Sequence, residues 1–246
     1  MTTVLKIGGS LITDKSDSHT IDERMLDRVA AAIAGADPDA IVLVHGGGSF
    51  GHPVAAAHGI TDRDIVCDPR AINAVVAAMT TLHETVLEVL TDAGVPAVSV
   101  PPRAIYRKRT DGTLEGSTGT IAEILAAGFI PVLHGDVVVH DAAGFSVASG
   151  DGIALHLAGA LEVDRIGLCT GVAGVLDRDG KVIDRIERFG EVADAIDDPE
   201  GTDVTGGMAR KVQTLLEMST PATIFGIEQL DTFLAGNRPG TTVSRA

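Results

Sequence analysis

The feature that most constrains the fold is an alternation of short apolar runs with longer helical patterns along the whole chain. The short runs are rich in β-branched residues and are bounded by Gly, Pro or Asp, which predicts buried strands. They cover residues 3–7, 41–44, 97–100, 130–133, 165–169 and 222–225. The longer patterns predict helices over 22–34, 69–92, 120–127, 152–160 and 206–218. We therefore predict an α/β fold of three layers, with an open, mostly parallel sheet and helices on both faces.

Two further features of the sequence concern an antiparallel pair of strands and the number of domains. Residues 137–140 are followed after three residues by 144–147, which predicts a small hairpin and therefore a mixed sheet. No internal repeat, low-complexity stretch or linker divides the 246 residues. That length fits one large α/β domain or two lobes that share one sheet. We expect a single domain over 1–246, with a lobe boundary near 160–164.

Charge and composition narrow the partners and the compartment. The formal net charge of −15 argues against nucleic-acid backbones and anionic lipid surfaces as partners. A well-solvated acidic surface is the favoured explanation, and adaptation to a high-salt cytoplasm is the other. No apolar run approaches the roughly 20 residues that a membrane span needs, and the first residues do not resemble a signal peptide. Since Cys67 and Cys169 are the only cysteines, no disulfide framework is indicated, and we expect a cytoplasmic protein.

The first segment that carries chemistry is Lys6-Ile7-Gly8-Gly9-Ser10, directly after the first predicted strand. Its two glycines let backbone N–H groups approach an anion closely, and Lys6 supplies positive charge. Lys15 follows in a loop that would close over the same anion. A glycine pair after a strand is usually only a turn, so this segment by itself is a weak indication.

The second segment is residues 45–52, which read His-Gly-Gly-Gly-Ser-Phe-Gly-His before an expected helix. The glycines permit a nest of N–H donors, and a helix N-terminus adds to an anion site. His52 is expected at that N-terminus, where it could donate to a phosphate oxygen. Gly46, Gly48 and Gly51 also match a dinucleotide-binding fingerprint, but the polar stretch that follows lacks the required second strand. The alternative is a tight turn with a surface histidine, which the four glycines and two histidines disfavour.

Two further segments place glycines beside polar groups. Gly135, and then Ser149-Gly150-Asp151, follow predicted strands where ligands of α/β proteins gather. Asp151 could orient lysines or help to hold magnesium through water, whereas an ordinary structural role is favoured for His134. Residues 203–211 combine a capped helix start, glycines and Lys211, which suits a nucleotide polyphosphate. The sequence has no G-x-x-x-x-G-K-[ST] loop and no cluster with zinc spacing, so we predict no metal site built by the protein alone.

In their order, the segments at 6–10, 45–52, 149–151 and 205–211 resemble those of the amino acid kinase family. The resemblance covers essentially the whole chain. Residues 46–52 most closely resemble the archaeal-type isopentenyl phosphate kinases, and fosfomycin kinases look similar. The resemblance implies ATP and Mg²⁺ as cofactors, a small-molecule phosphate acceptor and a homodimer. It also implies that residues of about 1–160 hold the acceptor and those of about 161–246 the nucleotide.

The resemblance further implies roles for the matching positions. Those assigned to the nucleotide are Lys6, Gly8, Gly9, Ser10, Gly48, Thr170, Gly206 and Lys211. Those assigned to the acceptor are Gly47, His52, Gly135, Ser149 and Gly150. Those assigned to catalysis are Lys6, Lys15, His52 and Asp151. One departure concerns residues 170–175, which read Thr-Gly-Val-Ala-Gly-Val where family members often have Thr-Asp-Val-Asp-Gly-Val. The preferred nucleotide base therefore stays open.

Three functions remain under consideration at this point. The first is ATP-dependent phosphorylation of isopentenyl phosphate to the diphosphate in isoprenoid biosynthesis. The second is another small-molecule kinase of the same fold, acting on a phosphonate such as fosfomycin or on a carboxylate or carbamate. The third is an anion-binding or storage protein without catalysis, which predicts loss of the motif lysines. Lys6, Lys15 and Lys211 are all present, which favours an enzyme.

Overall fold

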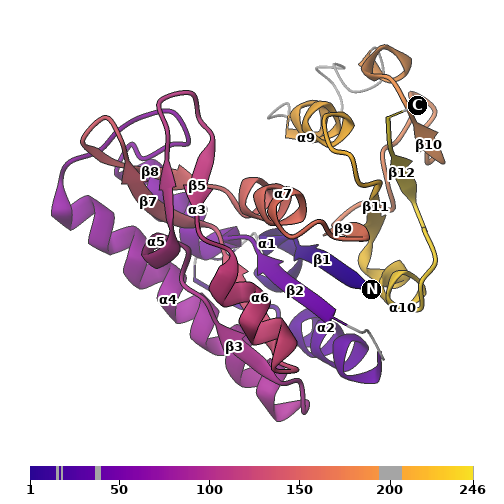
Figure 1. The fold of residues 1–246 in the computed structure, drawn as a ribbon, viewed down its shortest axis with the longest axis horizontal. Helices are drawn as coiled ribbons and strands as arrows, with labels where there is room; N and C mark the ends of the chain where they lie inside the picture. Colours follow the sequence, from indigo (N-terminus) through magenta and orange to yellow (C-terminus); the bar gives the residue numbers. More distant parts are fainter. Residues whose placement is uncertain (15–16, 18, 37–39, 194–206, 246) are drawn as a thin grey trace.

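The computed structural model describes the chain except for residues 15, 16, 18, 37–39, 194–206 and 246. The described residues form a large and a small β-sheet (Figure 1). The large sheet has eight strands among these residues, and all six strands predicted from the sequence belong to it. From edge to edge they are β10 (Arg185–Ile186), β12 (Thr241–Val243), β11 (Ala222–Gly226), β9 (Arg165–Thr170), β1 (Thr2–Ile7), β2 (Ala40–His45), β6 (Ile130–His134) and β3 (Ala97–Ser99).

The large sheet is open and mostly parallel, as predicted. Every neighbouring pair runs parallel except β11 and β12. The first strand of the chain, β1, is central and lies between β2 and β9. Because parallel strands share one direction, the loops that follow β1, β2, β6 and β9 leave the sheet at the same edge.

Helices cover both faces of this sheet, which confirms the three-layer prediction. Side chains of a strand alternate between faces, and the core residues divide accordingly. Leu5 and Leu43 pack on one side, while their neighbours Val4 and Val42 pack on the other. The first side holds α2 (Glu23–Gly35), α3 (Gly48–Ala57), α4 (Pro69–Asp92) and α10 (Leu230–Leu234). The second holds α6 (Gly119–Ala126), α7 (Gly150–Ala160) and α9 (Gly207–Leu216). The short helical turns are α1 (Gly9–Ile12), α5 (Pro102–Ile105), η1 (Phe189–Glu191) and η2 (Ile227–Gln229).

Helix α4 has the bounds predicted from the sequence. The Asp68 carboxylate caps it by accepting a hydrogen bond from the Arg70 N–H at 2.9 Å, and Pro69 occupies the first turn, where an N–H needs no partner. Its apolar stripe, including Met79 and Leu82, packs against the large sheet. Among the described residues α4 is the one helix that is long and apolar enough for a membrane span, a test that buried core helices also pass.

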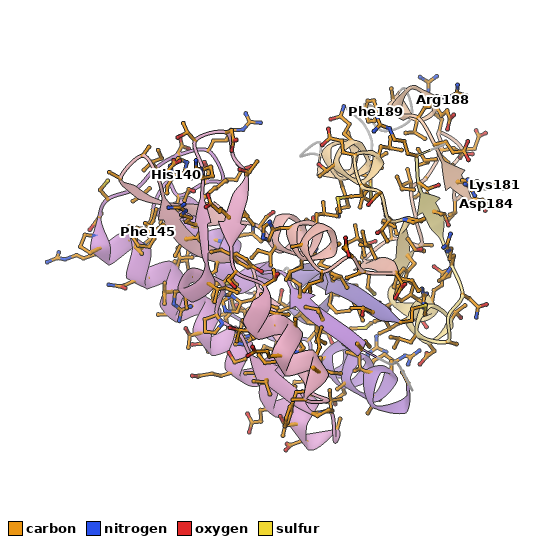
Figure 2. The ribbon with its side chains drawn as sticks, viewed as in Figure 1. His140, Phe145, Lys181, Asp184, Arg188 and Phe189 are labelled. Carbon is orange, nitrogen blue, oxygen red and sulfur yellow. The ribbon has the colours of Figure 1, made fainter. Side chains whose placement is uncertain are left out.

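The predicted hairpin forms, but it lies in a different sheet from the one expected. β7 (Asp136–His140) and β8 (Gly144–Ala148) pair antiparallel in the small sheet, whose order is β5 (Leu114–Gly116), β4 (Tyr106–Lys108), β7 and β8. The antiparallel pair of the large sheet comes from β12 instead. Figure 2 shows His140 and Phe145 of this small sheet at the end of the molecule opposite Lys181, Asp184, Arg188 and Phe189, which lie near β10.

Candidate active site

The predicted site residues gather at the carboxyl edge of the parallel strands. Hydrogen bonding between neighbouring strands continues past the last strand residue and fixes the first residue of each loop. The Gly46 N–H donates to the Ile7 carbonyl at 3.0 Å, and the Gly135 N–H donates to the His45 carbonyl at 3.0 Å. The loops after β1, β2 and β6 are therefore held beside one another, although they are far apart in the sequence.

The two glycine loops pack backbone against backbone. A Cβ atom on Gly9 would lie 2.2 Å from the Gly48 nitrogen and 2.7 Å from the Gly46 carbonyl carbon, so no larger residue fits without moving a loop. Gly48 has φ of +48°, a left-handed conformation that glycine adopts readily. The Thr13 hydroxyl ties the loops together, because it donates to the Gly9 carbonyl at 2.9 Å and accepts from the Ser49 N–H at 3.0 Å.

Two lysines converge on one carboxylate beside these loops. Lys6 Nζ lies 2.8 Å from Asp151 Oδ1, and Lys211 Nζ lies 3.6 Å from Asp151 Oδ2. The three side chains come from β1, α9 and α7, which are distant in the sequence. Burial acts to raise the pKa of Asp151, but the charges of Lys6 and Lys211 outweigh it and lower that pKa below its usual value. Asp151 is therefore ionised at neutral pH and holds two cations at the strand ends, the arrangement that its predicted orienting role requires.

Helix α7 places Asp151 in its first turn. Ser149 is the N-cap residue, and its hydroxyl accepts a hydrogen bond from the Gly152 N–H at 3.1 Å. α7 therefore begins at Gly150, two residues earlier than predicted. Gly150 approaches the end of β2 closely, since a Cβ there would lie 3.0 Å from the His45 carbonyl oxygen. Gly135 in turn packs on Gly150, because its Cβ would lie 3.2 Å from the Gly150 nitrogen.

His52 lies one turn inside α3, so its predicted position at the helix start is wrong. α3 begins at Gly48, with Gly47 as its N-cap residue. The His52 side chain is exposed and makes no hydrogen bond to the residues that the structure describes. Partial burial and the charge of Lys6 lower the pKa of His52, and Asp151 partly offsets them. A neutral imidazole at this position can donate one N–H to an anion bound beside Lys6.

The remaining predicted residues divide into described and undescribed positions. Gly8 donates its N–H to the Cys169 carbonyl at 2.9 Å, and Ser10 is exposed in α1. Thr170 ends β9, where its hydroxyl donates to the Val172 carbonyl at 3.0 Å. Lys15 and Gly206 fall outside the described residues, so their assignments stay predictions.

Sequence reasoning missed a cluster of three buried histidines behind the glycine loops. His45 ends β2, His134 ends β6, and His83 lies on the sheet-facing side of α4. The ring centroids of His45 and His83 are 5.2 Å apart, and those of His83 and His134 are 4.5 Å apart. One available signal was a histidine directly before a glycine at the end of two buried strands. His83 gave no such signal beyond its place on an apolar helix face.

Comparison with known proteins gives a consistent result. The model of the amino acid kinase family matches residues 1–224. The chain is 45% identical over 241 residues to the isopentenyl phosphate kinase of Haloferax volcanii, covering 98% of this chain and 97% of that protein. It is 34% identical over 227 residues to the isopentenyl phosphate kinase of Methanothermobacter thermautotrophicus, covering 87% and 85%.

Solved structures agree with these relatives. A crystal structure of isopentenyl phosphate kinase superposes with a TM-score of 0.83 at 29% identity, covering 99% of this chain and 100% of the other. The product complex of the Thermoplasma acidophilum isopentenyl phosphate kinase superposes with a TM-score of 0.79 at 26% identity over the full length of both chains. The chain therefore belongs to the amino acid kinase family, and within it to the group of the isopentenyl phosphate kinases.

Proposed function

We propose that this protein transfers the γ-phosphoryl group of ATP to isopentenyl phosphate and forms isopentenyl diphosphate. The observation that carries the proposal is the meeting of Lys6, Asp151 and Lys211 beside the glycine loop that leads into His52. This arrangement joins cations for a polyphosphate with N–H donors for a second anion. The extended similarity to kinases of isopentenyl phosphate supports the same substrate pair.

The chemistry of the acceptor means that the reaction requires no general base. The second pKa of a phosphate monoester is near 6, so its attacking oxygen is already largely ionised at neutral pH. The obstacle is the repulsion between two polyanions rather than removal of a proton. Catalysis must then come from positioning both phosphates and from stabilising negative charge in the transition state.

The described residues supply these two contributions. Lys6 is 8% exposed and ion-paired to Asp151, so its ammonium group is held in one place before substrate binds. We infer that Lys6 stabilises the transferring group and that Lys211 contacts the nucleotide phosphates from α9. Asp151 keeps both ammonium groups at the strand ends, which limits the reorganisation needed during the reaction.

Mg²⁺ fits this site as an ion held mainly by substrate. Among the described residues no group of three His, Cys, Asp or Glu side chains is placed to hold a metal ion, and Asp151 is the carboxylate at the centre of the site. Mg²⁺ commonly binds through one or two carboxylates plus substrate phosphates, with waters completing its shell. Asp151 would hold it through water, and the ion would neutralise charge on the ATP phosphates.

The two substrates are assigned to opposite sides of β1. Gly47, His52 and Gly135 follow β2 and β6, so we propose that residues of about 1–160 hold the acceptor. Thr170 and Lys211 belong to β9 and α9 on the other side, so about 161–246 would hold the nucleotide. β1 carries Lys6 between them, where the phosphoryl group would pass.

We also propose that the protein is a cytoplasmic homodimer adapted to high salt. The net charge of −15 supports the salt adaptation, because screening relieves repulsion among the acidic groups. The homodimer is what the resemblance to the amino acid kinase family implies. Size-exclusion chromatography with light scattering in molar potassium chloride measures the molar mass of the protein in solution. A monomer there would contradict the homodimer.

The test is a kinase assay on the purified protein with MgATP and a panel of acceptors. The panel contains isopentenyl phosphate, fosfomycin and N-acetylglutamate, since acetylglutamate kinases are also among the relatives. Of the three acceptors, we expect only isopentenyl phosphate to give ADP release and the ³¹P NMR signals of isopentenyl diphosphate. The Lys6→Ala variant should give neither. Faster turnover of fosfomycin or N-acetylglutamate would refute the substrate, and binding without ADP release would refute the enzyme.

A further inference from the structure

Three buried histidines and a serine form a connected group directly behind the acceptor loops. His45 Nε2 lies 2.9 Å from His83 Nδ1, and His83 Nε2 lies 2.9 Å from the Ser99 hydroxyl. At the other end of this chain, His45 Nδ1 lies 3.1 Å from the Gly46 carbonyl oxygen. The ring of His134 lies beside both other imidazoles. The exposed fractions of His45, His83 and His134 are 1%, 5% and 2%, whereas Ser99 at the end of the group is exposed.

The hydrogen bonds admit one arrangement of protons when the rings are neutral. The Gly46 carbonyl can only accept, so His45 must carry its proton on Nδ1. His45 Nε2 then accepts, so His83 must donate from its own Nδ1. His83 Nε2 is left to accept from the Ser99 hydroxyl. By the same reasoning His134 carries its proton on Nδ1, because that nitrogen lies 2.9 Å from the Gly135 carbonyl oxygen.

The hydrogen bonds from His45 to the Gly46 carbonyl and from His134 to the Gly135 carbonyl each set the direction of a loop peptide. In a planar trans peptide the carbonyl and the next N–H point in opposite directions. Since His45 draws the Gly46 carbonyl toward the buried ring, the Gly47 N–H must point away from it. That N–H has no acceptor among the described residues. His134 holds the Gly135 carbonyl in the same way, where the chain turns from β6 into β7.

We propose that His45 and His83 are positioning residues that aim the Gly47 N–H at the acceptor phosphate, and that His134 is a positioning residue that fixes the Gly135 turn beside it. The inference rests on the proposed function, since Gly47 and Gly135 serve the acceptor only if the substrate is a phosphate ester. None of the three rings touches the acceptor itself. His83 lies two hydrogen bonds from the Gly46 carbonyl and acts on it through His45.

The electrostatic surroundings keep this group neutral, as the proton arrangement requires. Burial lowers the pKa of His45 well below its usual value, and charge on His134, on His83 or on Lys6 would lower it further. Burial and the same kind of repulsion, from His134 and Arg103, lower the pKa of His83 to about 3. Burial also lowers the pKa of His134, although the Asp136 carboxylate partly offsets it. Asp136 is also ion-paired with Arg103 at 3.1 Å, and the charge of Arg103 acts to lower the pKa of His134.

A kinetic test compares two substitutions at His83. His83→Phe keeps a ring of similar size but removes the donor to His45, so the Gly46 peptide loses its support. We expect the KM for isopentenyl phosphate to rise about tenfold, as for weakening a hydrogen bond to a charged group, with kcat and the KM for ATP unchanged. His83→Asn retains an N–H near the Nδ1 position and should restore the acceptor KM to within about threefold of the wild type.

The control is Val86→Ala, which removes buried apolar atoms on the same face of α4 and leaves the three imidazoles and the Ser99 hydroxyl chemically unchanged. It should lower thermal stability and leave both KM values unchanged. Wild-type acceptor KM in His83→Phe, or an equal rise in both KM values, would overturn the inference. A wild-type enzyme inactive on isopentenyl phosphate would instead contradict the proposed function.

A spectroscopic test needs no turnover. ¹⁵N-histidine NMR distinguishes the two neutral tautomers and the protonated ring, and loss of signals in His45, His83 and His134 variants assigns them. We expect all three rings neutral with the proton on Nδ1 between about pH 7 and pH 8. A proton on Nε2 of His45 or His83, or protonation of the group in this range, would overturn the inference.

Discussion

The closest packing at the candidate site is between its two glycine loops, so a methyl group placed there should test the site most directly. In Gly9→Ala the new Cβ would lie 2.2 Å from the Gly48 nitrogen and 2.7 Å from the Gly46 carbonyl carbon. Both are backbone atoms rather than ends of flexible side chains. Reaching ordinary van der Waals contact requires the loops to separate by about 1 Å or more. Displacement of about 1 Å at a reacting centre can cost about a hundredfold in rate. We therefore expect kcat to fall by about that factor.

The same substitution has a bounded effect on stability. Overpacking costs about 1–3 kcal/mol, and at this size each kcal/mol lowers Tm by roughly 2–4 °C, so a folded enzyme with a reduced Tm is expected. Alanine retains the Gly9 N–H, so the rate loss would come from displacement rather than a missing donor. Gly35→Ala in α2 is the control, because among the described residues no atom outside its own helix lies within 4 Å of the Cβ position. Steady-state kinetics with melting curves decide it, and wild-type kcat in Gly9→Ala would refute this reasoning.

Three further outcomes follow from the site and the charge. His52→Ala should lower kcat/KM for the acceptor by roughly tenfold to a hundredfold, the worth of a hydrogen bond to a charged group, and leave the KM for ATP unchanged; His52→Gln should retain more activity, and unchanged acceptor kinetics in the alanine variant would remove His52 from the site. Since the folded-state pKa of Asp151 is lowered, its charge stabilises the fold above the unfolded value near 4, and this stability is lost as the pH falls through the folded value; the Tm difference between wild type and Asp151→Asn should therefore shrink from pH 7 to pH 3, and a constant difference would contradict the ion pairs. The protein should be more stable and more active in molar potassium chloride than in dilute buffer, and equal melting curves and rates in the two would refute salt adaptation.

Strong local signals explain what could be predicted of the fold. Helix α4 was predicted with its full bounds because Asp68 and Pro69 mark its start and a long apolar stripe follows. The strands that were missed are short and mixed in character, such as β4 with Tyr106-Arg107-Lys108 and β10 with Arg185-Ile186. The hairpin was predicted from two short strand-like runs close together in the sequence. Its choice of sheet depends on the partner strand β4, which no local pattern indicates.

The candidate site shows the same division between local and distant information. Glycine motifs after strands pointed to the correct edge of the sheet, because parallel topology brings those loops together. An orienting role of Asp151 toward lysines was predicted, but no spacing in the sequence indicated that those lysines are Lys6 and Lys211. His83 could not be predicted, since its partners His45 and Ser99 are brought to it by two strands of the folded sheet. Its side chain looks like any polar residue on an apolar helix face until the sheet is in place.

The position of β12 has a consequence for how the chain folds as it is made. β12 pairs with β11 on one side and with β10 on the other, and β10 has no other strand partner among the described residues. Residues 185–186 therefore cannot join the sheet until residues 241–243 have been synthesised and docked. During that interval the free side of β11 presents unpaired backbone groups, a surface that can recruit another unfinished chain. In the finished protein this edge should be the first part of the large sheet to open, while β1 is enclosed by a strand on either side.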